Sequence, residues 1–265
     1  MTDLDATTLR DSYDRHLRAH VPDPLPAGVS VERDGPLLRF LGFDEGGFLT
    51  YRDLGGLTGD ALDELIGRQV AIFRDRGEPV EWKLHGHDEP ADLPERLRAA
   101  GFVPAERETV VIGPAAPLAA ALPVVPEGVR LREVTARADL DRIVVMEEAV
   151  WGTDRGHLAP GLAKEIAADP QSITVVVAEA GNEVVCAGWV RYLHGSGFAT
   201  LWGGSTLPQW RRRGVYRALV TYRARLAVQR GATLLQVDAS EDSRPILQRL
   251  GFVAVTTTTP YVYTP

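Results

Sequence analysis

The sequence is most informative between residues 206 and 219, which read Thr206-Leu-Pro-Gln-Trp-Arg-Arg-Arg-Gly-Val-Tyr-Arg-Ala-Leu219. This stretch follows an apolar segment typical of a strand and opens a helical pattern. The first turn of a helix has backbone N–H groups without helical partners and a partial positive charge, so a loop wrapped over it can hold a phosphate or diphosphate. Gly214 permits close backbone approach, and the three preceding arginines add positive charge. We therefore predict an anion-binding loop here, with a solvated arginine run as the alternative.

The segments on both sides of this loop predict a mixed α/β domain whose central sheet is not simply doubly wound. Before the loop, a strand and a helix lead into three apolar segments joined by glycine turns, which is typical of an antiparallel meander. After the loop, a helix ends at Gly231 and a shorter one at Gly251. The first helix is expected over Leu140 to Trp151, and the strands over Val129 to Val134, Ile173 to Glu179, Val184 to Tyr192, Phe198 to Thr206, Thr233 to Asp238, Phe252 to Thr257 and Pro260 to Tyr263.

A connector with almost no charge divides the chain. Its prolines at positions 114, 117, 123 and 126 favour a semi-extended segment. The predicted organisation is a domain of residues 1–113, a linker rich in proline and alanine at residues 114–127, and a second domain of residues 128–265. Two domains also suit the length of the chain, since one domain usually has about 100 to 150 residues.

The N-terminal half repeats the ending of the C-terminal half in a weaker form. The run from Asp92 to Phe102 parallels the run from Ser243 to Phe252, because each leads from a short helix through a Gly-Phe pair. Upstream, Arg76-Gly77 precedes an expected strand at Val80 to Leu84, as Arg230-Gly231 precedes a strand in the second half. We interpret the halves as duplicated domains, with chance similarity of a common pattern as the alternative.

Composition and charge argue against several classes of partner. The net charge of -7 disfavours a general affinity for nucleic acid or anionic membrane. No segment approaches the roughly 18 apolar residues of a membrane span, and no basic start followed by an apolar run suggests a secretory signal. A soluble, cytoplasmic protein is therefore expected. Cys186 is the single cysteine, so an intrachain disulfide is excluded. It lies in an apolar run, which predicts a buried thiol.

The loop and its surroundings resemble the GNAT acetyltransferase superfamily, whose diphosphate loop has the form Q/R-x-x-G-x-G/A between the fourth strand and the third helix. Arg211 and Gly214 match the first two fixed positions. Tyr216 departs at the third position, and Arg212 stands where glycine is usual. The resemblance extends from Val129 to the end of the chain, and includes the meander and the final helix.

The resemblance implies an N-acetyltransferase that uses acetyl-CoA as cosubstrate and needs no metal. In the family, the pantetheine arm lies where the fourth and fifth strands diverge. An acceptor amine then attacks the acetyl carbonyl directly, while a backbone N–H holds the oxyanion. The implied partner is a small-molecule or peptide amine, and homodimerisation is left open. The implied acetyl-CoA-binding residues are Gly204, Ser205, Thr206, Arg211, Arg212, Arg213, Gly214, Val215 and Tyr216, with Gln236 to Asp238 across the divergence.

The first domain resembles a degenerate copy of the second. The segment before its corresponding helix is Tyr51 to Asp60, in which Asp53 and Asp60 would repel a diphosphate. We therefore expect a GNAT-like domain without a second active site. Its His85-x-His87 spacing is compatible with metal ligands, but two imidazoles without a third ligand argue against a metal site.

The proton carriers of the family are missing from their usual positions. Trp202 stands where many members have a glutamate, and Leu247 where they have a tyrosine. Glu147 is the best replacement base, because it falls on the apolar face of its helix and burial would raise its pKa. A glutamate at the edge of that face reaching solvent is the alternative. Asp154 and Asp238 are weaker candidates.

The missing proton carriers also suggest a different function, a catalytically silent module that binds acyl-CoA or another protein. Both functions predict coenzyme A binding, and only the enzyme predicts release of free thiol when an amine is added. Tyr261 and Tyr263 either line the mouth of an acceptor pocket or pack within the last strand.

Overall fold

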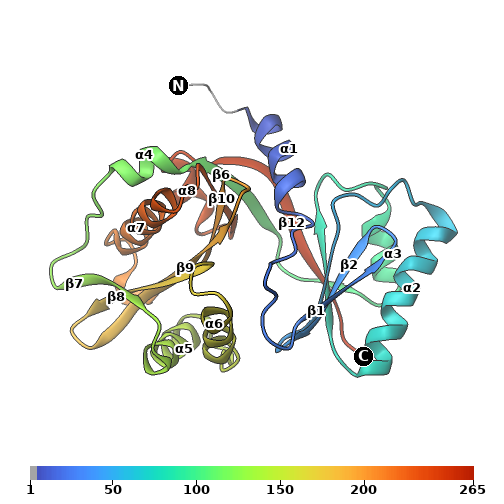
Figure 1. Ribbon diagram of the computed structural model, residues 1–265, viewed down its shortest axis with the longest axis horizontal. Helices are drawn as coiled ribbons and strands as arrows, with labels where there is room; N and C mark the ends of the chain where they lie inside the picture. Colours follow the sequence, from blue (N-terminus) through green and yellow to red (C-terminus); the bar gives the residue numbers. More distant parts are fainter. Residues whose placement is uncertain (1–4) are drawn as a thin grey trace. The chain divides into compact units, whose positions relative to one another are not determined.

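A computed structural model describes residues 5–265 and shows that the chain forms two compact units (Figure 1). Unit 1 contains the residues up to 110, residues 238–241 and residues 254–265. Unit 2 contains residues 111–237 and 242–253. Each unit combines a mixed sheet with helices, so the prediction of a mixed α/β fold is confirmed. No helix among the described residues is long and apolar enough to cross a membrane.

Unit 1 is built on strands in the order β1-β2-β3-β4-β12, with β5 paired to β12. β1 to β3 form an antiparallel meander, β3 runs parallel to β4, and β12 is antiparallel to β4. The elements are α1 (Ala6–His16), β1 (Ser30–Asp34), β2 (Leu37–Phe43), β3 (Gly46–Thr50), α2 (Gly59–Arg76), β4 (Val80–His85), α3 (Leu93–Ala99), β5 (Val103–Pro104) and the greater part of β12 (Val253–Tyr263).

The core of unit 1 forms where α2 covers the sheet. Buried residues recur along α2 at three- to four-residue spacing, as expected for a helix with one apolar face, at Leu62, Leu65, Ile66, Gln69 and Phe73. The helix ends at Gly77, whose left-handed conformation (φ 63°) allows the chain to turn towards β4. Trp82 of β4 is fully buried in this core.

Unit 2 is built on strands in the order β11-β10-β9-β8-β7, with β6 next to β11. β7 to β10 are antiparallel, whereas β10 and β11 are parallel. The elements are the end of β6 (Glu108–Pro114), α4 (Ala115–Ala120), β7 (Val129–Val134), α5 (Arg137–Trp151), α6 (Leu158–Ala168), β8 (Ile173–Ala180), β9 (Glu183–Leu193), β10 (Phe198–Thr206), the short helix η1 (Pro208–Trp210), α7 (Val215–Gln229), β11 (Leu234–Ala239) up to residue 237, and α8 (Arg244–Arg249).

Helices cover both faces of the sheet in unit 2. α5 and α6 lie on one face and α7 on the opposite face (Figure 1). The core between them is rich in valine and alanine from β8 and β9, and Cys186 is fully buried among these side chains. α5 from one face and α7 from the other both contact β10, so side chains from both faces of the sheet can meet at this strand.

The structure differs from the sequence-based expectation at two segments. The expected semi-extended connector contains α4, in which Ala115 and Leu118 are buried. Pro117 is tolerated there because the first backbone N–H groups of a helix have no helical partner. The last strand, expected in the second domain, pairs with β4 in unit 1, with Tyr261 opposite Trp82. The last strand therefore belongs to unit 1, although the sequence analysis placed it in the second domain.

Candidate active site

The end of β10 is bulged. Its register with β9 passes from Gly203 opposite Gly188 to Ser205 opposite Ala187, so Gly204 has no partner residue on β9. Both glycines have positive φ values, 66° at Gly203 and 89° at Gly204, which other residues rarely adopt. A bulge of this kind turns backbone and side chains away from the regular ladder. The expected acetyl-CoA residues Gly204, Ser205 and Thr206 therefore lie together at an irregular strand end.

The neighbouring strand pairs with only the start of β10. The parallel register of β10 and β11 covers Phe198–Thr200 opposite Leu234–Gln236, whereas the register of β10 with β9 continues to Thr206. This is the geometry expected for two strands that diverge beyond Thr200. The sequence analysis placed the pantetheine arm at this position.

The arginine loop follows directly after the bulge. Arg211 donates a hydrogen bond from Nε to the carbonyl oxygen of Thr206 at 3.2 Å. The guanidinium of Arg213 lies 5.0 Å from the ring centre of Trp210, which is a cation–π arrangement. All four residues from 211 to 214 are exposed. The loop thus presents positive charge to solvent, and no acidic residue occupies the first turn of α7.

The backbone of this loop adopts the left-handed conformation that usually requires glycine. Arg212 has φ 61° and is the non-glycine residue with positive φ among the described residues. A side chain in the left-handed region costs about 1 kcal/mol or more. The family form has glycine at this position, so the chain keeps the loop conformation despite the substitution. Gly214, with φ 85°, caps α7 and leaves its first backbone N–H groups without side-chain partners.

Tyr216 contacts the bulge and does not lean outward. A Cβ atom on Gly204 would lie 2.7 Å from Cε2 of Tyr216, so glycine is required for the ring to pack there. Burial raises the pKa of the Tyr216 hydroxyl. The ring of Tyr216 therefore occupies space beside the bulged end of β10. Val215, next to it, is buried in the core.

Glu147 on α5 is buried and turned towards the bulge. Its side chain belongs to a residue only 5% exposed, so the alternative of a solvent-reaching glutamate is wrong. Oε2 accepts a hydrogen bond from Ser205 Oγ at 3.0 Å and another from Trp151 Nε1 at 2.8 Å. Trp151 Nε1 also lies 3.0 Å from Ser205 Oγ, which closes a three-residue cluster. Oε1 is buried without a hydrogen-bond partner.

The environment of Glu147 suits a proton acceptor. Burial raises the pKa of its carboxyl, while the hydrogen bonds from Ser205 and Trp151 and the charge of Arg155 act in the opposite direction. A carboxylate with a moderately raised pKa is a better general base near neutral pH than an exposed one. The Ser205 hydroxyl connects this carboxylate to the bulged end of β10.

Arg223 is a buried residue next to the bulge that the sequence analysis did not identify. This α7 residue is 1% exposed, and its Nη1 donates to the carbonyl oxygens of Trp189 at 3.1 Å and Trp202 at 2.9 Å. These two residues are opposite each other on β9 and β10. Arg223 thereby holds the two strands together immediately before the bulge. An arginine at helical spacing on an apolar face is the sequence signal that could have identified it.

The thiol of Cys186 is structural. The residue is fully buried, and Thr206 Oγ1 lies 3.1 Å from its Sγ. Burial raises the pKa of the thiol to about 11, so the thiolate is disfavoured near neutral pH. The expected buried, unreactive cysteine is what the structure shows.

Trp202 and Leu247, which stand where the family has its proton carriers, differ in exposure. Trp202 is 41% exposed, with the guanidinium of Arg191 4.8 Å from its ring centre. Leu247 is fully buried. Neither side chain can exchange a proton. Among the predicted proton acceptors, Glu147 is the one that lies at the bulge.

The weaker candidates have structural partners elsewhere. Asp154 accepts the backbone N–H of Gly156 at 2.8 Å in a tight turn. Asp238 forms an ion pair with Lys83 within unit 1. Tyr261 is buried with the guanidinium of Arg98 over its ring, in unit 1. These contacts favour a structural role for each of the three.

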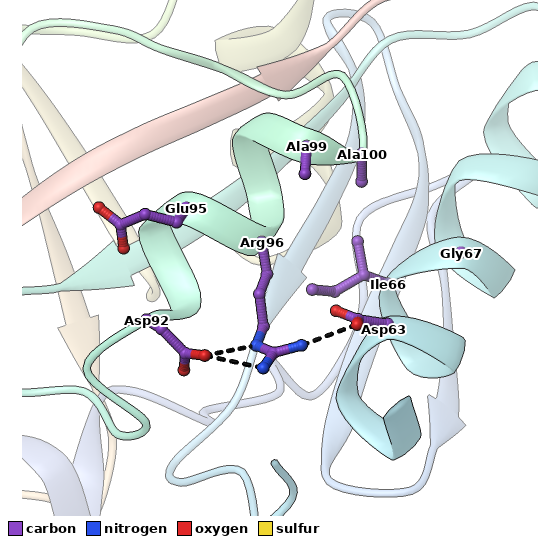
Figure 2. A pocket seen from close by; sticks show the side chains of 8 residues that line it. All are labelled: Asp63, Ile66, Gly67, Asp92, Glu95, Arg96, Ala99 and Ala100. Carbon is purple, nitrogen blue, oxygen red and sulfur yellow. Dashed lines mark hydrogen bonds and ion pairs between the residues drawn. The ribbon is translucent and has the colours of Figure 1, made fainter. Parts of the chain in front are cut away.

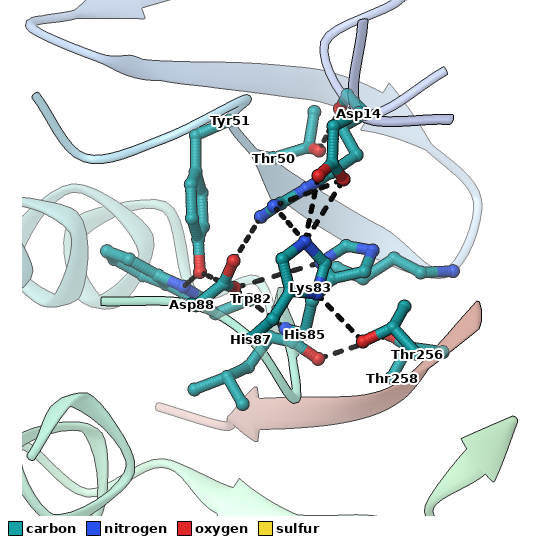
Figure 3. Close-up of polar contacts among 12 residues, drawn as sticks. Asp14, Thr50, Tyr51, Trp82, Lys83, His85, His87, Asp88, Thr256 and Thr258 are labelled. Carbon is teal, nitrogen blue, oxygen red and sulfur yellow. Dashed lines mark hydrogen bonds and ion pairs between the residues drawn. The ribbon is translucent and has the colours of Figure 1, made fainter. Parts of the chain in front are cut away.

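Unit 1 contains a polar cluster that includes both histidines of the His85-x-His87 motif (Figure 3). His85 Nε2 lies 2.9 Å from the hydroxyl of Tyr13. His87 contacts Asp14 through Nε2 at 2.9 Å and Thr256 through Nδ1 at 2.7 Å. No group of three metal-ligating side chains is found among residues 5–265. The histidines therefore act as hydrogen-bonding residues in this cluster.

Asp88 is the centre of the same cluster. It pairs with Arg18, accepts the Tyr51 hydroxyl at 2.6 Å and accepts the backbone N–H of His85 at 2.7 Å. Although burial alone would raise its pKa, the His85 side chain, the charge of Arg18 and the Tyr51 hydroxyl lower the pKa of Asp88 to about 2. A cavity of about 330 Å³ adjoins the cluster and is lined by the loop from Tyr51 to Thr58. Four acidic residues against two arginines line it, which disfavours a diphosphate.

The other hollow of unit 1 lies between α2 and α3 (Figure 2). Arg96 spans it, pairing with Asp63 at 2.7 Å and Asp92 at 2.8 Å. The charges of Arg96, Asp63 and Asp92 compensate one another. No serine, threonine, cysteine, histidine or tyrosine is among the described residues that line the hollow. It carries no chemistry comparable to the bulge in unit 2.

Comparison with known proteins agrees with the fold. Residues 137–252 match the family "Acetyltransferase (GNAT) family". A GCN5-related N-acetyltransferase from Kribbella flavida has 18% identity and a TM-score of 0.66, and the similarity covers 90% of each chain. No match was found among curated proteins.

Two further solved structures are similar over the length of the chain. A tandem GNAT protein from the clavulanic acid biosynthesis pathway has 13% identity and a TM-score of 0.59, covering 90% of this chain and 84% of that one. A conserved protein of unknown function from Staphylococcus epidermidis has 13% identity and a TM-score of 0.67, covering 91% and 96%. The predicted resemblance and the tandem GNAT-like fold are therefore confirmed.

Proposed function

We propose that this chain, whose residues 137–252 form a domain of the GNAT acetyltransferase family, transfers an acetyl group from acetyl-CoA to an amine by direct attack. The observation that carries the proposal is the cluster of Glu147, Ser205 and Trp151 at the bulged end of β10. This cluster places a buried carboxylate where the positively charged loop and the diverging strands meet. The family match supplies the reaction class, and the cluster supplies a proton acceptor that the usual family positions lack.

The arginine loop would bind the diphosphate of the cosubstrate. The exposed guanidinium groups of Arg211, Arg212 and Arg213 and the first N–H groups of α7 are complementary to a dianion. The pantetheine arm would then follow the divergence of β10 and β11 past Gly204. Tyr216 would bound this path on the α7 side, since its ring already contacts Gly204.

Attack of the amine on the thioester requires a proton acceptor and an oxyanion site. Glu147 would receive the proton of the acceptor ammonium through the Ser205 hydroxyl, which donates to Oε2. Gly204 stands outside the β9 register, and we assign stabilisation of the developing oxyanion to its backbone N–H. The nitrogen then loses its second proton to solvent water, the carbon–sulfur bond breaks, and the departing coenzyme A thiolate takes a proton from solvent.

A catalytically silent acyl-CoA-binding or interaction module is the second candidate. Trp202 and Leu247 favour it, because neither can serve as the family's proton carrier. The two candidates differ in turnover. Both predict binding of coenzyme A, and the silent module predicts no release of free thiol with any amine.

The test is thiol release from acetyl-CoA across a panel of primary amines, with Glu147→Gln run beside the wild type. The enzyme predicts amine-dependent thiol release that falls in the variant while acetyl-CoA binding is retained. Binding of acetyl-CoA without amine-dependent release would support the silent module. Absence of both would contradict each candidate.

A further inference from the structure

Arg155 lies near the proposed base, since its charge opposes the rise that burial causes in the pKa of Glu147, but its guanidinium forms no ion pair at contact distance among the described residues. It lies in the connection between α5 and α6, where its guanidinium carbon is 5.7 Å from the ring centre of Trp151. Its Nε is buried and has no hydrogen-bond partner. Its backbone N–H donates to Glu148 Oε1 at 3.2 Å, but no ion pair of its side chain is found in the described part of the chain.

Several other arginines of unit 2 have carboxylates as partners. Arg191 forms a two-pronged ion pair with Glu165, at 2.6 and 2.8 Å. Arg132 and Arg142 share the carboxylates of Asp139 and Glu179. Others donate to backbone carbonyls, as Arg211 and the buried Arg223 do. Arg155 has neither kind of partner at Nε.

A second unpartnered atom belongs to Glu147, which also contacts Trp151. Glu147 Oε1 is buried and accepts no hydrogen bond, while Oε2 accepts two. Trp151 connects the two groups, since its Nε1 donates to Glu147 and its ring lies under Arg155. Leaving a buried polar atom unsatisfied costs about 1–3 kcal/mol. One ligand with a positive and a negative group would satisfy both atoms.

We propose that the acceptor is a primary amine that also carries a carboxylate, with Arg155 binding the carboxylate and the Glu147–Ser205 pair receiving the ammonium. The proposal rests on the acetyltransferase function and names the class of its acceptor. Guanidinium groups bind carboxylates through two parallel N–H donors, so Arg155 would select the anionic acceptor and the half-exposed Trp151 would hold the guanidinium in place. Arg155 is thereby a specificity-determining residue for this site.

The test compares amines that differ only in the carboxylate. Glycine, β-alanine, 4-aminobutanoate and 6-aminohexanoate would each be assayed against the corresponding carboxamide, which spans the separations between amine and carboxylate. We expect at least one amino acid to exceed its carboxamide about 10- to 100-fold in kcat/KM, as for one charge-assisted pair. Equal kcat/KM within every pair would overturn the proposal while leaving the acetyltransferase function intact.

Variants separate recognition from fold. In Arg155→Gln the preference for the amino acid over its carboxamide should fall to near unity, mainly through KM. Arg155→Lys should restore part of the preference. Arg137→Gln is the matched control, because Arg137 is an exposed arginine of α5 paired with Asp141. A preference that persists in Arg155→Gln would assign carboxylate recognition to another residue and overturn the proposal.

Binding without turnover provides an independent readout. The preferred amino acid should raise the thermal unfolding midpoint of the wild type in the absence of acetyl-CoA, and this stabilisation should be lost in Arg155→Gln. If neither amino acids nor carboxamides release thiol, the proposed function fails and this proposal fails with it. If carboxamides react and amino acids do not, only the assignment of Arg155 fails.

Discussion

At the residue scale, the proposed reaction depends on Glu147. It is a carboxylate on the apolar face of α5, held by Ser205 and Trp151 and raised in pKa by burial. The position was predictable because helical spacing identifies which side of a helix faces the core. Its partners were not, since Ser205 is 58 residues away along the chain and reaches Glu147 only because β10 is bulged.

Replacing Glu147 with glutamine should remove the base. We expect kcat/KM to fall by about 10²- to 10⁴-fold, as for loss of a general base. In the wild type, activity should rise with pH through the raised pKa of Glu147, because the ionised form accepts the proton. That rising limb should disappear in Glu147→Gln. Asp141→Asn, an exposed carboxylate of the same helix, is the control, and an unchanged pH–rate profile in Glu147→Gln would remove Glu147 from the mechanism.

At the scale of elements, the bulge of β10 and the loop before α7 act together. Gly204 gives the bulge its positive φ and makes room for Tyr216, while Arg212 adopts the left-handed backbone that the loop requires. The sequence predicted the loop from the strand and helix on either side of it. It did not predict the bulge, because a break in strand register depends on the neighbouring strand and leaves no periodic signal.

Gly204→Ala should destabilise the protein through two effects. The new Cβ would lie 2.7 Å from the Tyr216 ring, and the residue would be held at φ 89°. We expect a loss of about 2–4 kcal/mol in the free energy of unfolding, measured by chemical denaturation. Gly181→Ala is the control, with φ 58° and open space around its Cβ, and should cost about 1 kcal/mol. Equal losses would show that Tyr216 does not restrict this position.

Reversing the charge of Arg211 and Arg213 together should weaken coenzyme A binding without unfolding the protein. Both side chains are exposed, so the free energy of unfolding should change by less than about 0.5 kcal/mol. The dissociation constant, measured by calorimetry, should rise about 10- to 100-fold for loss of the diphosphate contacts. Arg225→Glu, an exposed arginine further along α7, should leave it unchanged. Unaltered affinity in the double variant would place the diphosphate elsewhere.

At the scale of the whole molecule, the boundaries of the two GNAT-like units differ from those of the two domains predicted from the sequence. Strand periodicity predicted most elements of unit 2, and the repeat predicted a related first half. Neither could assign the last strand to unit 1, because an extended segment does not encode its partner, and Thr258 and Tyr261 are buried only once β4 is beside them. The proline-rich connector was expected to be extended for the same reason, since burial of Leu118 depends on packing within unit 2.

Unit 1 provides a pH test of its own buried polar groups. Burial, with a further contribution from Asp238, raises the pKa of Glu108 from 4.5 to about 7. Since the folded pKa exceeds the unfolded one, ionisation disfavours folding, and stability should fall as the pH rises from about 4.5 to about 7. Glu108→Gln should flatten this fall by about 1–3 kcal/mol in denaturation at several pH values. The exposed neighbour in Glu106→Gln is the control, and an identical pH dependence in Glu108→Gln would contradict the raised pKa.

The most direct test of the proposed acetyltransferase site is a calorimetric titration of the full chain with acetyl-CoA, repeated with Gly214→Asp. The arrangement of loop, bulge and diverging strands in unit 2 predicts binding at one site per chain in the micromolar range and its loss in the variant, which adds a negative charge at the cap of α7. Absence of binding to the wild type, or equal binding to Gly214→Asp, would contradict the assignment of the acetyl-CoA site to unit 2.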